Sequence, residues 1–174
     1  MKLLTEILSK EHENILKFID VLLKKCEIME KKKEIDKDFF EGAIDFIRNY
    51  ADKFHHAKEE NILFKELCKD TVEMRCNPVE QMLYEHDLGR NFVKGIEDGL
   101  KKKDISKIIK NSKGYADLLR EHIYKEDNIL YPMAEQSLGK AIKIKILKEF
   151  ERIKKSKDKD KALAFLKSLK NEKF

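Results

Sequence analysis

A ten-residue stretch that occurs twice decides the fold: residues 55–64 read HHAKEENILF, and residues 122–131 read HIYKEDNILY. In each copy a histidine, His55 or His122, precedes a glutamate by four residues. On an α-helix this spacing places the imidazole and the carboxylate one above the other on the same face. Two such pairs, each followed by an apolar run, indicate a metal ion held between helices.

Two further histidines, His12 and His86, stand in the triplets Glu-His-Glu (11–13) and Glu-His-Asp (85–87). Each interrupts an apolar stripe whose members recur every three or four residues, which predicts a helix face turned to the core. The chain therefore reads as two helical hairpins. Each hairpin supplies one lone histidine and one His-x-x-x-Glu pair, and the halves would face each other across a pseudo-two-fold axis.

Taken singly, each of these signals has an ordinary explanation. A lone histidine on an apolar face is usually a hydrogen-bonded core residue, and a lone His–Glu pair is usually a surface pair worth about 0.2–0.5 kcal/mol. Four of the five histidines, however, fall on core stripes of four different predicted helices. Leaving several such groups buried and unpaired would cost a few kcal/mol each, comparable to the whole stability of a domain. A bound metal is the better interpretation.

Length and composition favour a nearly all-helical protein. The 174 residues include 41% charged residues, only six glycines and two prolines, without strand-like alternation. We expect an antiparallel up-down-up-down four-helix bundle over residues 1–135 and a basic helical extension over 136–174. Asp36 or Asp38, Asn77, Asp104 and Ser137 are the expected helix caps, and Pro132 should bend or stop the fourth helix. The expected helices are 2–30, 38–67, 78–100, about 105–133, 138–153 and 162–169.

Charge distribution, hydropathy and cysteine content indicate which partners and which compartment to expect for this protein. Residues 140–174 hold thirteen basic and five acidic residues, a net +8, whereas the first 139 residues carry about −3. We interpret the extension as a solvated lysine-rich face that could also receive a protein partner, and we expect no nucleic-acid partner.

No apolar run approaches the roughly 20 residues of a membrane span, and a signal-peptide core is lacking. Cys26, Cys68 and Cys76 form no CxxC pair, which predicts reduced thiols in the cytoplasm.

The types of ligand atom available limit which metal ions the site could bind. Imidazole and carboxylate without thiolate suit iron, zinc, manganese or copper and argue against a cysteine-rich structural zinc site. Five histidines and two glutamates are too many for one tetrahedral ion, but they suit two ions bridged by carboxylates with one position left open. The Glu-x-x-His signature of ferritin-like di-iron proteins is absent from the sequence, where the order is reversed.

With these motifs, EHE, HxxxEExxLF, EHDxGR and HxxxEDxxLYP, the sequence resembles the hemerythrins and hemerythrin-like HHE cation-binding proteins over about residues 1–135. The resemblance implies a four-helix bundle around two non-haem iron ions with an oxo or hydroxo bridge. The terminal ligands would be His12, His55, His86 and His122. The bridging carboxylates would be Glu59 and Glu126.

The sequence departs from the oxygen-carrying hemerythrins at two places. Met82 stands where they have a second histidine on the third helix, and their last spacing would select Asp127 instead of Glu126. Glu126 fits the bacterial HHE pattern and the internal repeat better. We expect His56, which is three residues before the motif glutamate, to replace the missing histidine, with Glu60 as the alternative; a plain boundary histidine is the competing interpretation.

These features predict a di-iron protein that binds or responds to dioxygen, in sensing, scavenging or delivery. The alternatives are a di-iron redox protein acting on peroxide or nitric oxide, an iron donor that repairs damaged iron centres, and a regulator whose iron state alters a partner surface. We expect an oxygen- and iron-binding protein more than a dedicated enzyme, since the sequence shows no nucleophile triad, P-loop or dinucleotide fingerprint. Gly89, one turn beyond His86, could leave space for a small ligand or let two helices approach.

Overall fold

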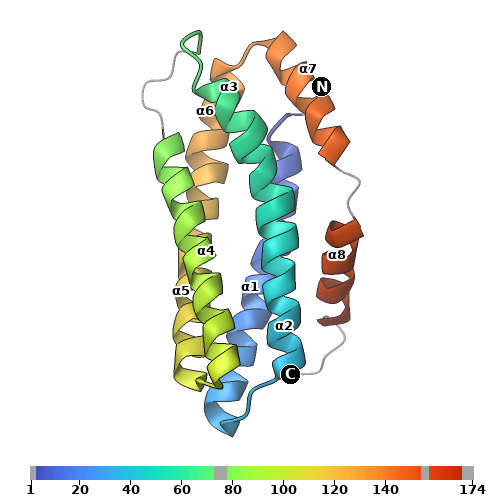
Figure 1. Cartoon of the computed structure of the whole chain (residues 1–174). Coiled ribbons are helices and arrows are strands. Elements are labelled where there is room, and N and C mark those ends of the chain that lie inside the picture. The colour runs from blue at the N-terminus through green and yellow to red at the C-terminus, as the bar shows by residue number, and fades with distance from the viewer. Residues whose placement is uncertain (1–2, 73–77, 154–156, 170–174) are drawn as a thin grey trace.

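All regular secondary structure is helical in the residues that the computed structural model describes, which are 3–72, 78–153 and 157–169. The all-helical prediction is therefore confirmed. Figure 1 shows the longest helical segments side by side as a bundle, with the turns after α1 and α4 at the same end. In chain order these segments are α1 (Glu6–Lys32); the continuous run α2 (Lys37–Phe46), η1 (Ile47–His56), η2 (Glu59–Leu63) and α3 (Phe64–Leu67); α4 (Val79–Lys102); and the run α5 (Ile105–Lys125), η3 (Glu126–Leu130) and α6 (Tyr131–Ser137).

Local sequence explains where the segments begin and end. The side chain of Asp36 accepts a hydrogen bond from the backbone N–H of Phe39 at 3.1 Å, and Asp104 caps α5 through Lys107 N–H at 2.9 Å. Both caps were predicted. α1 and α4 end in lysine-rich turns, which suit the negative end of the helix dipole. The predicted cap Asn77, like Cys76, lies outside the described residues.

The repeated motifs adopt π-helical geometry that the sequence did not predict. Glu59 is the first residue of η2, and Glu126 is the first residue of η3. Single π turns inside α-helices are often found at functional sites. The two copies share this deviation at the motif glutamate, but η1, which contains His55 and His56, has no counterpart, because His122 and Ile123 belong to the α-helix α5.

The end of the fourth segment corrects two expectations. Pro132, which was expected to bend or stop the helix, does not stop it: Pro132 is the second residue of α6, just after η3, and the run continues to Ser137. Ser137 is the last residue of α6 instead of the cap of the next helix, and α7 (Lys140–Ile153) follows.

Two apolar clusters stand at the two ends of the bundle and leave a polar layer between them. The first cluster is built around Phe18, Phe46 and Tyr50, and the second around Leu63 and Phe150. The polar layer consists of seven buried residues that lie in the chain between members of the two clusters: His12, His55, His56, Glu59, His86, His122 and Glu126.

The basic extension packs on the bundle. In α8 (Lys157–Leu169), Ala162, Leu166 and Leu169 belong to the first apolar cluster, and α8 contacts α2 and η1. α8 begins earlier than predicted, since residues 157–161 of the expected charged break are helical; residues 154–156 lie outside the described part. Among the described helices, none combines the length and apolarity that a bilayer span requires. The boundary near residue 135 and the cytoplasmic location stay predictions.

Candidate metal centre

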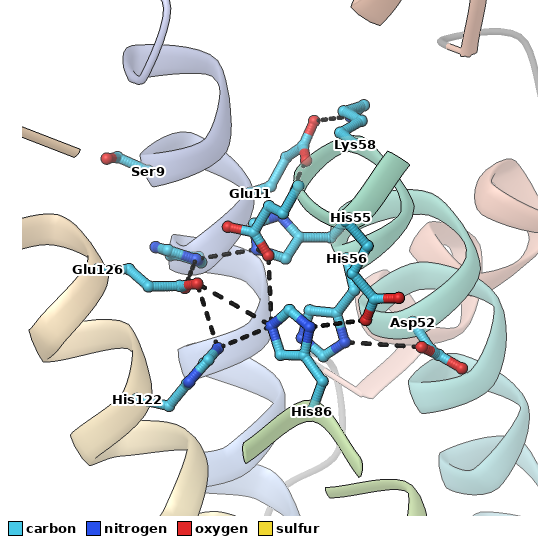
Figure 2. Close-up of polar contacts among 12 residues, drawn as sticks. Ser9, Glu11, Asp52, His55, His56, Lys58, His86, His122 and Glu126 are labelled. Carbon is cyan, nitrogen blue, oxygen red and sulfur yellow. Dashed lines mark hydrogen bonds and ion pairs between the residues drawn. The ribbon is translucent and has the colours of Figure 1, made fainter. Parts of the chain in front are cut away.

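Four imidazoles from four helical segments point into the middle of the polar layer. The Nε2 atoms of His12 (α1) and His55 (η1) lie 2.9 Å apart, and those of His86 (α4) and His122 (α5) lie 3.0 Å apart. All four side chains are buried. Figure 2 shows His55, His86 and His122 directed toward a common centre with Glu126 among them. The structure thus brings together the four histidines that the sequence placed on separate core stripes.

The two motif glutamates connect the histidine pairs. Glu126 places Oε2 3.2 Å from His12 Nε2 and Oε1 3.3 Å from His122 Nε2. Glu59 places a single oxygen, Oε2, 3.6 Å from His55 Nε2 and 3.5 Å from His86 Nε2. Neither carboxylate has measurable solvent exposure. Each therefore reaches from one histidine pair to the other, which is the arrangement expected of a bridging ligand.

This donor set fits metal cations. Within the described residues, Glu59 Oε2 and both carboxylate oxygens of Glu126 are buried without a hydrogen-bond partner. Unpaired buried carboxylate oxygens are costly, and imidazole nitrogen with carboxylate oxygen is a common ligand set for iron and zinc. Ligand atoms lie within 4.8 Å of one another in two buried groups: His12, His55, Glu59 and Glu126, and His56, His86 and His122.

A second layer of carboxylates holds the histidines from outside. Each of the four inward-pointing imidazoles has its Nδ1 atom within hydrogen-bond distance of a carboxylate. The pairs are His12–Asp127 (3.0 Å), His55–Glu11 (3.0 Å), His86–Glu60 (2.7 Å) and His122–Glu85 (2.8 Å). A carboxylate at Nδ1 keeps the proton on that nitrogen and leaves the Nε2 lone pair for a metal.

These outer carboxylates are themselves anchored by cations or hydroxyls. Ser9 donates to Asp127 at 2.7 Å, and Arg90 donates to Glu60 at 2.6 Å. Lys58 donates to Glu11, and Lys125 donates to Glu85. Lys58 is itself buried, which is unusual for lysine and indicates a pair built for this support.

Sequence reasoning had not assigned a role to the acids of the Glu-His triplets. It had left Glu60 and Asp127 open as ligands, whereas the structure places both against outer histidine nitrogens. The signal that would have found them is the repeat itself: Glu11 and Glu85 directly precede the lone histidines, and Glu60 and Asp127 directly follow the motif glutamates.

The electrostatics show what a metal would replace. Burial lowers the pKa of His12, but the hydrogen bond with Asp127 and the nearby negative charge of Glu126 outweigh it and raise the pKa to about 9. Burial likewise opposes ionisation of His122, whose pKa rises to about 10 because of Glu126 and Glu85. Burial, with repulsion from Glu126, raises the pKa of Glu59 well above its usual range. Without a metal, protons therefore neutralise the layer, so metal binding should release protons.

His56 lies beside the centre, but among the described residues its ring is not held by a carboxylate within hydrogen-bond distance as the other four imidazoles are. Its ring stacks on His86 with centroids 3.7 Å apart, and Nδ1 lies 3.6 Å from Asp52 Oδ1. Neither ring nitrogen has a hydrogen-bond partner in the described part of the chain. Arg90 already donates to both Asp52 and Glu60, which supplies the positive charge on that side. Ligation by His56 stays a prediction.

A cavity of about 220 Å³ reaches the polar layer next to His56 and His86. Its other walls include Gly89, Val93 and Tyr115. A Cβ atom added at Gly89 would meet Tyr115 at 3.6 Å, an ordinary contact, so helix packing alone does not require a glycine there. The cavity offers a small molecule a route to one side of the centre.

Removing an outer carboxylate should weaken metal binding without removing a ligand. Glu85→Gln loses the charge that orients His122 and pairs with Lys125. We expect about tenfold weaker binding of cobalt(II), measured by calorimetry, because outer-layer partners typically contribute 10- to 100-fold to affinity. Glu80→Gln, on an exposed position of the same helix, is the control and should bind as the unmodified chain does. Equal affinities of the two variants would contradict the role of Glu85.

Comparison with known proteins agrees with this geometry. The family model of the hemerythrin HHE cation-binding domain matches residues 3–134, which contain every residue of the polar layer. Among curated proteins and among solved structures, no match was found. The match covers most of the chain, and the chain belongs to the hemerythrin HHE cation-binding family.

Proposed function

We propose that the chain forms an antiparallel four-helix bundle that holds two iron ions and binds dioxygen at them. The observation that carries the proposal is Glu126, a fully buried carboxylate with one oxygen beside each histidine pair and no hydrogen bond to either oxygen within the described residues. One position would use His12 and His55, and the other would use His86 and His122 with His56. Glu59 and Glu126 would join them.

Bound iron would supply a reversible change of oxidation state and a coordination position for a small ligand. The protein's part is to orient the donors and exclude water. The outer carboxylates fix the imidazoles, and the apolar clusters close both ends of the polar layer. A dry surrounding slows loss of a bound ligand to side reactions with water.

The size of the cavity favours a small ligand over a larger substrate. Its volume is about 220 Å³, and its walls combine the charged side chains of Arg48, Asp52, Arg90 and Lys94 with Ile47, Gly89, Val93 and Tyr115. Sites for larger ligands typically measure about 300 to 1,000 Å³. This supports oxygen binding, or another small diatomic or peroxide ligand, ahead of chemistry on a large substrate.

Anaerobic reconstitution with ferrous iron tests the proposal. We expect about two irons per chain, in line with other bundle-core di-iron proteins. Exposure to oxygen should produce visible bands that disappear when oxygen is removed. Irreversible bleaching or steady consumption of peroxide or nitric oxide would instead favour a redox enzyme. A single tightly bound zinc ion with no uptake of iron would contradict the proposal altogether.

His56→Ile tests the predicted ligand with a residue that the fold already accepts, because Ile123 occupies the corresponding place in the repeat. We expect this variant to keep one iron in place of two, or to show shifted bands, because one position loses an imidazole. Met82→Leu is the control, since Met82 packs in the second apolar cluster and should cost only packing. Two irons and unaltered bands in His56→Ile would remove His56 from the ligand set.

A further inference from the structure

The internal repeat allows the two halves of the centre to be compared residue by residue. Phe64 and Tyr131 end the two copies of the motif. Phe64 stacks on His86 with ring centroids 5.9 Å apart, and Tyr131 stacks on His12 at 5.6 Å. The rings thus occupy matching places against the two lone histidines. Only Tyr131 carries a hydroxyl.

That hydroxyl changes how one of the two glutamates faces the centre. The phenol of Tyr131 donates to Glu59 Oε1 at 2.5 Å and lies 3.4 Å from His12 Nε2. Only Oε2 of Glu59 is left to approach the histidines, and it approaches one member of each pair. Glu126, whose matching ring is a phenylalanine, turns a separate oxygen toward each pair. The two carboxylates are therefore not equivalent.

We propose that Tyr131 makes the two metal positions unequal by holding one oxygen of Glu59, so that the position at His12 and His55 binds its ion more weakly and fills second. This inference rests on the proposed two-ion function. The phenol stands on the His12 side of the centre, so the oxygen that it engages, Oε1, is withdrawn from the position at His12 and His55, and only the shared Oε2 is left there. A carboxylate oxygen that accepts a hydrogen bond is also a poorer donor to a cation.

The position at His86 and His122 differs in the opposite direction, because it has an additional ligand group. His56 adds a third imidazole beside His86 and His122, whereas its counterpart in the repeat is Ile123. The position at His86 and His122 is thereby richer in donors and fills first. A centre with one tightly and one weakly held ion can exchange a single ion while its core stays bonded.

Titration of the metal-free full chain with cobalt(II) tests the inference, followed by calorimetry and visible absorption. We expect two steps whose dissociation constants differ by at least about tenfold. Tyr131→Phe should tighten the second step by roughly fivefold or more and leave the first unchanged, since a hydrogen bond to a charged group is worth about a factor of ten. Phenylalanine at the matching position shows that the fold accepts this ring.

Phe64→Tyr is the matched variant. It places a hydroxyl where it can hold Glu126 as Tyr131 holds Glu59, so it should weaken binding instead of tightening it. The inference would be overturned if the two cobalt(II) dissociation constants were equal in the unmodified chain, or if their ratio were the same in Tyr131→Phe. Either result would leave two-ion binding intact. In the chain loaded with iron and exposed to oxygen, a phenolate-to-iron(III) band that disappears in Tyr131→Phe would also overturn the inference, because the phenol would then be a ligand. Binding of only one ion overturns the proposed function as well.

Discussion

The structure depends on the burial of a polar layer whose two glutamates have no measurable solvent exposure. Five imidazoles and two carboxylates lie between two apolar clusters, where each unpaired polar atom would cost a substantial part of the stability of a domain. The outer nitrogens of four of these imidazoles are bonded to carboxylates that belong to the protein. The inner nitrogens and the oxygens of Glu126 face one another. A cation at the centre is what completes this layer.

The duplicated hairpin explains how one sequence builds so many matched contacts. Glu11 and Glu85 hold the motif histidine of the neighbouring segment, and Lys58 and Lys125 hold these glutamates in turn. The two sets differ in their surroundings. Lys58 is buried and lies over the ring of Phe54, which Lys159 of α8 also approaches, whereas Lys125 is about one-third exposed. The support of one histidine is thus buried close to the extension, and its counterpart lies at the surface.

Much of the fold and of the inner site could be predicted from the sequence. Steps of three and four residues fix which face of a helix is buried, and a histidine on such a face must point to the core; this located His12, His55, His86 and His122 correctly. The outer pairs could not be predicted in the same way. Glu11 holds His55 from another segment instead of its own neighbour His12, and only the packing of the segments decides that partner.

The backbone geometry of the repeated motif was the other feature that the spacing of residues in the sequence did not predict. Over one turn, an α-helix and a π-helix bury nearly the same apolar residues, so the apolar pattern does not distinguish them at Glu59 and Glu126. Pro132 was predicted to bend or stop its helix, but the run continues past it to Ser137. The role of Tyr131 depends on a contact with Glu59 across the bundle, which no local pattern reveals.

The central claim, that a bound metal completes the polar layer, is tested most directly by thermal unfolding of the same chain with and without metal. The metal-free chain in chelator and the chain loaded anaerobically with two equivalents of ferrous iron should be compared at pH 7. Tight binding to the folded state alone adds several kcal/mol, so the loaded chain should melt roughly 10 °C higher or more. Coincident melting curves would mean that the layer is satisfied without a metal and would contradict the account.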